Sequence, residues 1–230
     1  MKPRPCNRHG AQTARQSLLD SRNRFWKTSD IDAPASTVQH LLADLVDQGE
    51  LRHIRKGLYW RGTRTPIGMS PPPPQALVTQ LIGKTGVGPA GLSAANALRL
   101  STQVPRRAEY AVPARPPADT AAVHFVNRSS RRGRVDYELG HTEVAVLEVL
   151  DGWDRLVEIG PVAAMGRLGE LILDGKLDAG RLAGASETEP GAARARLRHL
   201  LRQAGRADLA EKVPAADPRT EARALAGLAS

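Results

Sequence analysis

The chain is poor in cysteine and in aromatic residues, and both shortages limit what it can be. Cys6 is the only cysteine among 230 residues. An intramolecular disulfide and a zinc site built from several cysteines are therefore excluded. Phe, Trp and Tyr make up 3% of the residues, so a core has to be built from Leu, Val, Ile and Ala. At 41% hydrophobic residues, the chain is apolar enough to fold as one large or two small domains.

Long apolar runs and metal-ligand spacings are also missing. No run approaches the roughly 18 to 20 apolar residues that cross a bilayer, and the basic residues 1–10 precede no apolar segment of a signal peptide. We therefore expect a cytoplasmic protein with no membrane partner. The six histidines are dispersed, and no two are four residues apart as in a helical metal site. We expect no bound metal.

Positive charge is abundant but unevenly distributed. Residues 1–66 carry 12 Lys and Arg against 6 acids, and residues 67–136 carry 9 against 3. Residues 137–190 carry 4 against 11, and residues 191–230 carry 8 against 4. A basic first half suits an anionic partner, with nucleic acid the first candidate and an acidic protein the second.

Proline marks the expected domain boundary. The stretch "PIGMSPPPP" at 66–74 cannot continue a helix or a central strand. We therefore assign 1–66 to a first domain, 67–74 to a stiff linker and 75–206 to a mostly helical α+β domain. Strands are predicted at 109–113 and 122–129, and helices at 75–82, 92–100, 142–150, 161–173 and 190–204. Residues 207–230 contain few apolar side chains, so we expect them to be partly disordered.

The first domain has the pattern of a winged helix. Helices are predicted at 12–22, from Thr28 or Ser29 to Asp32, and from Ser36 to Gly49. Ser36 and Gln39 have capping-box spacing, so Ser36 is expected to be the N-cap. The buried stripe of this third helix is expected to be Val38, Leu41, Leu42, Leu45 and Val46. Residues 51–60 alternate as two short strands that turn at Lys56-Gly57.

A winged helix of this kind predicts DNA binding. The third helix enters the major groove with its N-terminal end, and the basic hairpin contacts phosphates nearby. The candidate DNA-binding residues are Lys27, Thr28, Ser29, Ser36, Thr37, Gln39, His40, Arg52, Arg55, Lys56, Tyr59 and Arg61. Protein-docking domains share the same pattern, so docking remains an alternative.

A second basic patch is predicted beside the strand at 122–129. Its residues are Arg128, Arg131, Arg132 and Arg134. Together with Ser129 and Ser130 they either bind phosphate at the strand end or form an ordinary solvated loop.

A glycine-rich stretch at 83–91 raises the question of a nucleotide site. The spacing G-x-G-x-x-G is present at Gly86, Gly88 and Gly91, after Gly83-Lys84-Thr85. Val78 stands where a P-loop needs its first glycine. The dinucleotide motif needs a preceding strand, whereas 75–82 has a helical pattern and Pro89 interrupts the motif. The pattern favours a turn into a helix, so we expect no cofactor and no enzymatic activity.

Several segments resemble AbiEi-type antitoxins. "TSDID" (28–32), followed by "VQHLLADLVDQGELRHIRKGLYW" (38–60), resembles the winged-helix start of that family. "GLSAANALRLSTQVP" (91–105) resembles its Ala-Ala-Asn to Gln-Val-Pro segment, with Arg99 where the family usually has Gly. "VHFVNRSSRRGR" (123–134) resembles its strand and basic stretch. The resemblance covers about residues 25–205.

The resemblance implies two partners, operator DNA and a nucleotidyltransferase-like toxin encoded beside the antitoxin. Our first hypothesis is therefore a DNA-binding antitoxin that represses its own promoter. The alternative is a winged-helix regulator whose second domain senses a ligand or dimerises, with no toxin. A third hypothesis, an enzyme that uses the glycine-rich turn, is disfavoured by the motif context.

Overall fold

The computed structural model describes residues 8–66 and 68–228, so Cys6 lies outside the described residues. The chain divides into two units, residues 1–80 and 81–230, and the boundary falls near the end of helix α3 (Pro74–Leu81). Helices and small sheets occur in the two units, and the expected α+β fold class is confirmed. The unit boundary follows the proline-rich stretch and does not lie within it.

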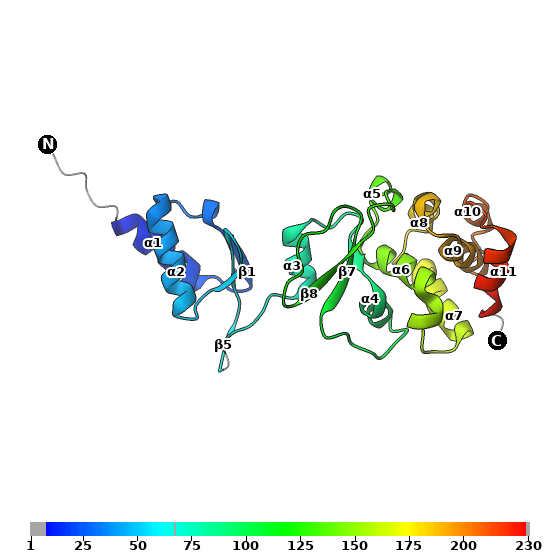
Figure 1. Ribbon diagram of the computed structural model, residues 1–230, viewed down its shortest axis with the longest axis horizontal. Coiled ribbons are helices and arrows are strands. Elements are labelled where there is room, and N and C mark those ends of the chain that lie inside the picture. The colour runs from blue at the N-terminus through cyan, green and yellow to red at the C-terminus, as the bar shows by residue number, and fades with distance from the viewer. Residues whose placement is uncertain (1–7, 67, 229–230) are drawn as a thin grey trace. The chain divides into compact units, whose positions relative to one another are not determined.

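The first unit has the element order of a winged helix (Figure 1). Its elements are α1 (Arg8–Asp20), β1 (Arg24–Lys27), the 3-10 turn η1 (Thr28–Asp30), α2 (Ala35–Asp47), β2 (Arg52–Arg55) and β3 (Leu58–Arg61). The strands form an antiparallel sheet in the order β1-β3-β2. The sequence did not predict β1, and the expected second helix is a single 3-10 turn.

Helix α2 begins one residue before the predicted cap. Pro34 occupies the N-cap position, and the Ser36 side chain accepts no capping hydrogen bond. The predicted capping box at Ser36 and Gln39 is therefore wrong. Gly49 follows the helix with a φ of +68°, as expected for a glycine that ends one.

The sheet of the first unit is covered on both faces. Trp26 and Tyr59 pack with the buried leucines of α1 and α2. On the other face, Phe25 and Trp60 are in ring contact, and Trp60 Nε1 donates to the carbonyl of Ser70 at 2.9 Å. The hairpin β4 (Arg64–Thr65) and β5 (Gly68–Met69) precedes Ser70. Part of the expected linker 67–74 therefore packs on the first unit.

The second unit contains a mixed three-stranded sheet. Its strands are β6 (Gly88–Pro89), β7 (Ala108–Val112) and β8 (Val123–Asn127). Strand β6 pairs antiparallel with β7, which pairs parallel with β8. The two longer strands match the predicted ones, and α4 (Gly91–Ala97) lies between β6 and β7 in the sequence.

The glycine-rich stretch packs closely against several neighbouring segments, one of which is α6 (His141–Leu156). A Cβ on Gly88 would lie 2.6 Å from the carbonyl oxygen of His141, so only glycine fits at this first position of β6. Gly86 has a φ of +68°, and its N–H donates to the Leu139 carbonyl at 2.8 Å. Close approach and a left-handed turn account for these glycines.

Helices form the rest of the second unit. They are α5 (Gly133–Asp136), α6, α7 (Pro161–Leu173), α8 (Ala179–Ala185), the 3-10 turn η2 (Ser186–Thr188), α9 (Gly191–Gln203), α10 (Ala207–Ala210) and α11 (Pro218–Ala226). Helix α6 is buried over residues 143–150 and contacts β6, α4 and α9. Figure 1 shows α6 with α4 and α9 near it. A helix that is buried all round is the centre of a core.

The C-terminal segment is ordered where the structure describes it, so the expected disorder of residues 207–230 is wrong up to residue 228. Leu209, Ala224 and Leu228 are buried, and Arg196 Nε donates to the Ala224 carbonyl at 3.2 Å. Few apolar residues suffice here because α11 packs along α9. Within the described ranges, no helix combines the length and apolar character needed to cross a membrane.

Candidate nucleic-acid interface

Two segments that are far apart in the sequence meet at one end of the winged-helix sheet. The Thr28 N–H donates to the Gly57 carbonyl at 3.2 Å, and Lys27 pairs with Leu58 across β1 and β3. Gly57 has a φ of +75°, which the tight turn after Lys56 requires. The exposed Lys27 and Lys56 are therefore brought together.

The 3-10 turn η1 adds hydroxyl groups beside these lysines. The Lys27 N–H donates to Asp30 Oδ2 at 2.8 Å, which fixes the start of the turn. Thr28 and Ser29 are exposed, and η1 also contacts α2. The turn thus connects the lysines to the candidate recognition helix.

Helix α2 presents a polar face without Lys or Arg. Ser36, Gln39 and His40 are exposed and Thr37 is half-buried, whereas Val38, Leu41, Leu42 and Leu45 are buried as predicted. Further along, Asp44 and Asp47 are exposed. Only the N-terminal half of this face is therefore suited to nucleic acid, and phosphate contacts have to come from neighbouring segments.

The hairpin cations are not equally available. Arg55 and Lys56 are exposed, and within residues 8–66 and 68–228 their side chains make no hydrogen bond or ion pair. Arg52 is exposed but donates through Nη2 to the Met69 carbonyl at 2.8 Å. The turn itself therefore offers the freest positive charge.

Two of the predicted hairpin contacts have structural roles instead. Arg61 forms an ion pair with Glu50 at 3.2 Å and donates to the Leu19 carbonyl at 3.3 Å. Tyr59 is half-buried and packs against the domain core. The assignment of Arg61 and Tyr59 to DNA binding is corrected, because these side chains hold the hairpin on the helices.

Sequence reasoning missed Arg24, an exposed cation on β1. Its guanidinium lies 4.1 Å from the ring centroid of Trp26, in a cation–π arrangement. The alternation in "RFWK" could have predicted this strand, since Phe and Trp favour strands.

The second basic patch is a buried ion-pair network. Arg134 is 0% exposed and binds Glu189 through two hydrogen bonds of 2.6 and 2.9 Å. Arg134 also donates to Glu148 at 2.8 Å, and Arg131, 8% exposed, donates to Glu148 at 3.1 Å. Arg128 binds the same Glu148 through two hydrogen bonds. Arg128, Arg131 and Arg134 are therefore structural partners of acids, and neither of the two predicted alternatives, a phosphate site or an ordinary solvated loop, describes them.

The pKa of Glu148 follows from this network. Burial alone would raise the pKa of its carboxyl, but the Arg128 hydrogen bond and the charges of Arg134, Arg128 and Arg131 outweigh burial and hold the pKa below its ordinary value. Glu148 is therefore ionised among the arginines. Arg132 alone of the four predicted residues is exposed.

Comparison with known proteins adds a likeness of fold. No protein-family model and no curated protein matches the chain. The structure is similar to the crystal structure of the RV2827C protein from Mycobacterium tuberculosis, with a TM-score of 0.51 and 15% sequence identity. The match covers 89% of this chain and 80% of that chain. At this identity the likeness shows a shared fold and no more.

Proposed function

We propose that the chain is a DNA-binding antitoxin that represses its own promoter and counteracts a nucleotidyltransferase-like toxin. The observation that carries the DNA-binding part is the meeting of η1 with the hairpin turn through the Thr28–Gly57 hydrogen bond. This contact gathers Lys27 and Lys56 beside hydroxyl groups, and η1 in turn contacts α2. Exposed cations and hydroxyls near a helix start are the groups that bind phosphate and position a helix on DNA.

Charge supports the same surface. Residues 1–66 carry 12 Lys and Arg against 6 acids, and α2 itself contributes no Lys or Arg. The hairpin and the end of β1 then supply phosphate neutralisation through Arg55, Lys56 and Lys27. Binding of this kind weakens steeply with salt because each phosphate contact releases a counterion.

The start of α2 supports a role in reading bases. Ser36 and Gln39 are exposed, and their side chains make no hydrogen bond with any part of the chain that the structure describes. Gln pairs with adenine in the major groove, and Ser and Thr bind several bases. We assign operator discrimination to Ser36, Thr37 and Gln39, with His40 at the edge.

The toxin part of the proposal rests on the resemblance of residues 28–60, 91–105 and 123–134 to AbiEi-type antitoxins. The alternative, a winged-helix regulator without a toxin, makes the same use of the first unit. The gene next to this one separates them. A neighbouring nucleotidyltransferase-like protein whose toxicity is relieved by this chain supports the antitoxin, and undiminished toxicity on co-expression contradicts it.

Base reading is tested with Thr37→Ala combined with Gln39→Ala. Fluorescence anisotropy is measured on the chain's own promoter and on random DNA of equal length. Each good base contact contributes about 1–3 kcal/mol of discrimination, so the ratio of the two affinities is expected to fall at least about fivefold. The control is Gln48→Ala, an exposed residue beyond the far end of α2. Its side chain accepts a hydrogen bond from Arg15 Nη2 at 2.7 Å, so the stability of this variant is measured alongside its affinity ratio. An unchanged ratio in the folded double variant removes α2 as the reading helix.

A further inference from the structure

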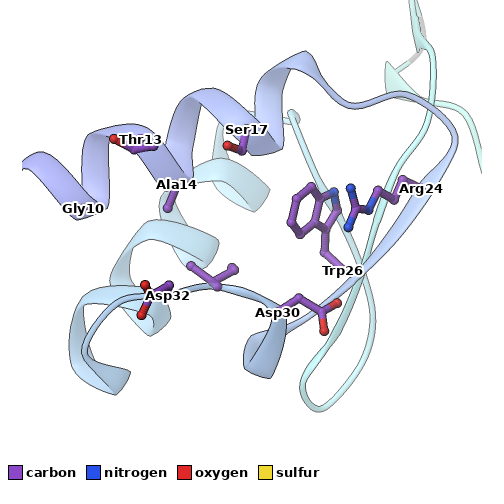
Figure 2. A pocket seen from close by; sticks show the side chains of 9 residues that line it. Gly10, Thr13, Ala14, Ser17, Arg24, Trp26, Asp30 and Asp32 are labelled. Carbon is purple, nitrogen blue, oxygen red and sulfur yellow. The ribbon is translucent and has the colours of Figure 1, made fainter.

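The first unit contains a pocket that the proposed DNA surface does not use. The pocket has a volume of about 550 Å³ and lies between α1, β1 and the segment that leads into α2 (Figure 2). Small-molecule sites commonly occupy roughly 300–1,000 Å³. The pocket is therefore large enough for a small organic ligand.

Small residues on α1 keep the space open. Gly10, Ala14 and Ser17 recur at helical spacing and line one wall. Trp26 and Ile31 line the pocket too and are only 6% and 7% exposed. Figure 2 shows Ala14 and Ser17 on the helix, with Trp26 beside them. This wall offers an apolar surface to a ligand body.

Two carboxylates stand on the opposite wall. Asp30 and Asp32 line the pocket and are exposed (Figure 2). In the chain as described, the Asp32 carboxylate makes no hydrogen bond or ion pair. Asp30 uses Oδ2 to accept from the Lys27 N–H and leaves Oδ1 without a partner among those residues. Acceptor oxygens thus remain available at the rim.

The charge of the pocket runs against that of its surroundings. Its two acids outnumber its one cation, Arg24, whose guanidinium already lies over the Trp26 ring. The rest of residues 1–66 is rich in Lys and Arg. An acidic hollow in a cationic unit favours a positively charged occupant, because the nearest charges have the largest effect.

We propose that this pocket binds a small organic cation, an amidine, guanidine or amine on a flat apolar body. Its charged end pairs with the Asp32 carboxylate, and the Asp30 carboxylate adds negative charge at the rim. Its apolar body lies against Ala14, Ile31 and the rim of Trp26, within reach of the Ser17 hydroxyl. Charge-assisted hydrogen bonds to carboxylates are about twice as strong as neutral ones.

Such a ligand would regulate DNA binding, an inference that rests on the proposed function. Asp30 is the last residue of η1, and Asp32 lies between η1 and α2. The occupant touches α1 on one side and this connection on the other. Occupancy then biases the placement of η1 and α2, the two elements assigned to DNA.

Benzamidine is the probe, and its neutral isostere benzamide is the comparison. Both are titrated into the full chain by calorimetry and by NMR of the tryptophan indole N–H groups. We expect saturable binding of benzamidine, a shifted Trp26 signal and an unmoved signal from Trp153 in the second unit. Benzamide is expected to bind at least about tenfold more weakly, since it lacks the charge. No saturation up to about 10 mM benzamidine, or equal binding of both compounds, overturns the ligand class.

Two variants and one control locate the site. Asp32→Asn keeps the shape and removes the charge, so benzamidine affinity is expected to fall about tenfold. Ala14→Leu keeps the charges and fills the space, so it is expected to abolish binding. Asp47→Asn makes the same charge change on exposed α2 surface outside the pocket and is expected to change nothing. Wild-type affinity in both pocket variants overturns the assignment.

Operator binding measured with and without benzamidine tests separately whether the ligand regulates DNA binding. We expect operator affinity to change at least about threefold at saturation, and an unchanged affinity overturns the regulatory role. If the chain binds no DNA at all but binds benzamidine at Asp32, the proposed function fails and the pocket assignment stands.

Discussion

In the first unit, Arg55 and Lys56 stand exposed at the hairpin turn, whereas in the second unit Arg131 and Arg134 are buried among carboxylates. Both sets come from basic stretches of the sequence. The difference lies in the partners that folding brings to each. A run of arginines indicates a binding surface only when no acid from elsewhere in the chain reaches it.

The acids of the second unit come from a distant stretch. Glu148 and Glu189 belong to residues 137–190, where 11 acids outnumber 4 Lys and Arg. These acids neutralise cations of residues 67–136, which carry 9 Lys and Arg against 3 acids. The positive charge of residues 67–136 and the negative charge of residues 137–190 therefore partly cancel inside the core of the second unit. Residues 1–66 have an excess of Lys and Arg and no such acidic stretch.

The largest expected effect comes from breaking the buried network. Glu189→Ala removes two of the three hydrogen bonds of the buried Arg134 and leaves its Nε and Nη2 without an acceptor. The second unit is therefore expected to lose about 3–5 kcal/mol of unfolding free energy. Chemical denaturation measures the loss. Arg132→Ala, an exposed neighbour, is expected to stay within about 0.5 kcal/mol. Equal stability of the two variants would mean that the buried arginines do not need their acid partners. The contrast between the two units would then disappear.

A core change in the first unit is expected to have the next largest effect. Leu45 is 0% exposed, so Leu45→Ala is expected to cost about 2–5 kcal/mol. The exposed Ala43→Ser serves as the control. Calorimetry should show the first unit melting earlier and the second unit unchanged. A joint shift of both transitions would mean that the two units unfold together, which contradicts this expectation.

A glycine at Arg99 is expected to stabilise the second unit slightly. Arg99 has a φ of +56° at the end of α4, and its side chain is exposed. A left-handed conformation costs about 1–2 kcal/mol for such a residue, and glycine avoids this cost. Part of the gain is offset because glycine loses more conformational entropy on folding. Arg99→Gly is therefore expected to gain about 0.5–1 kcal/mol. A loss of stability in denaturation would mean that the arginine side chain contributes more than its backbone costs.

The smallest expected effect concerns pH. Burial lowers the pKa of His141 in the folded chain, whereas the unfolded chain keeps an ordinary value of about 6.5. The unfolded state then binds more protons, so stability is present above that value and is lost as pH falls through the folded pKa. The loss between about pH 7 and pH 5 is expected to shrink in His141→Phe. Identical pH profiles would exclude His141 as the cause.

The sequence predicted what local pattern determines. The helix from 161 to 173, the strand at 123–127 and the turn at Gly57 follow from periodicity and glycine chemistry. Strand β1 was missed because four residues give little alternation, and it exists through pairing with β3. The burial of Arg134 depends on Glu189, 55 residues away. No local pattern reports such a partner.

The candidate site likewise combines features that local patterns predict with features that only tertiary contacts determine. The exposed positions of Lys56 and Gln39 follow from the hairpin and helix patterns. The ion pair between Arg61 and Glu50, which removes Arg61 from the candidate site, depends on tertiary contacts. The pocket beside Trp26 does too.

Operator binding measured across a range of salt concentrations tests the contrast between the units most directly. Arg55→Ala with Lys56→Ala removes two exposed turn charges, and Lys84→Ala with Arg106→Ala removes two exposed charges from the second unit. If each turn residue contacts a phosphate, the slope of log affinity against log salt shrinks by about 0.9 per contact in the first pair. The second pair is expected to keep the wild-type slope. Normal affinity of the folded turn variant at every salt concentration would contradict the assignment of DNA binding to the winged-helix turn.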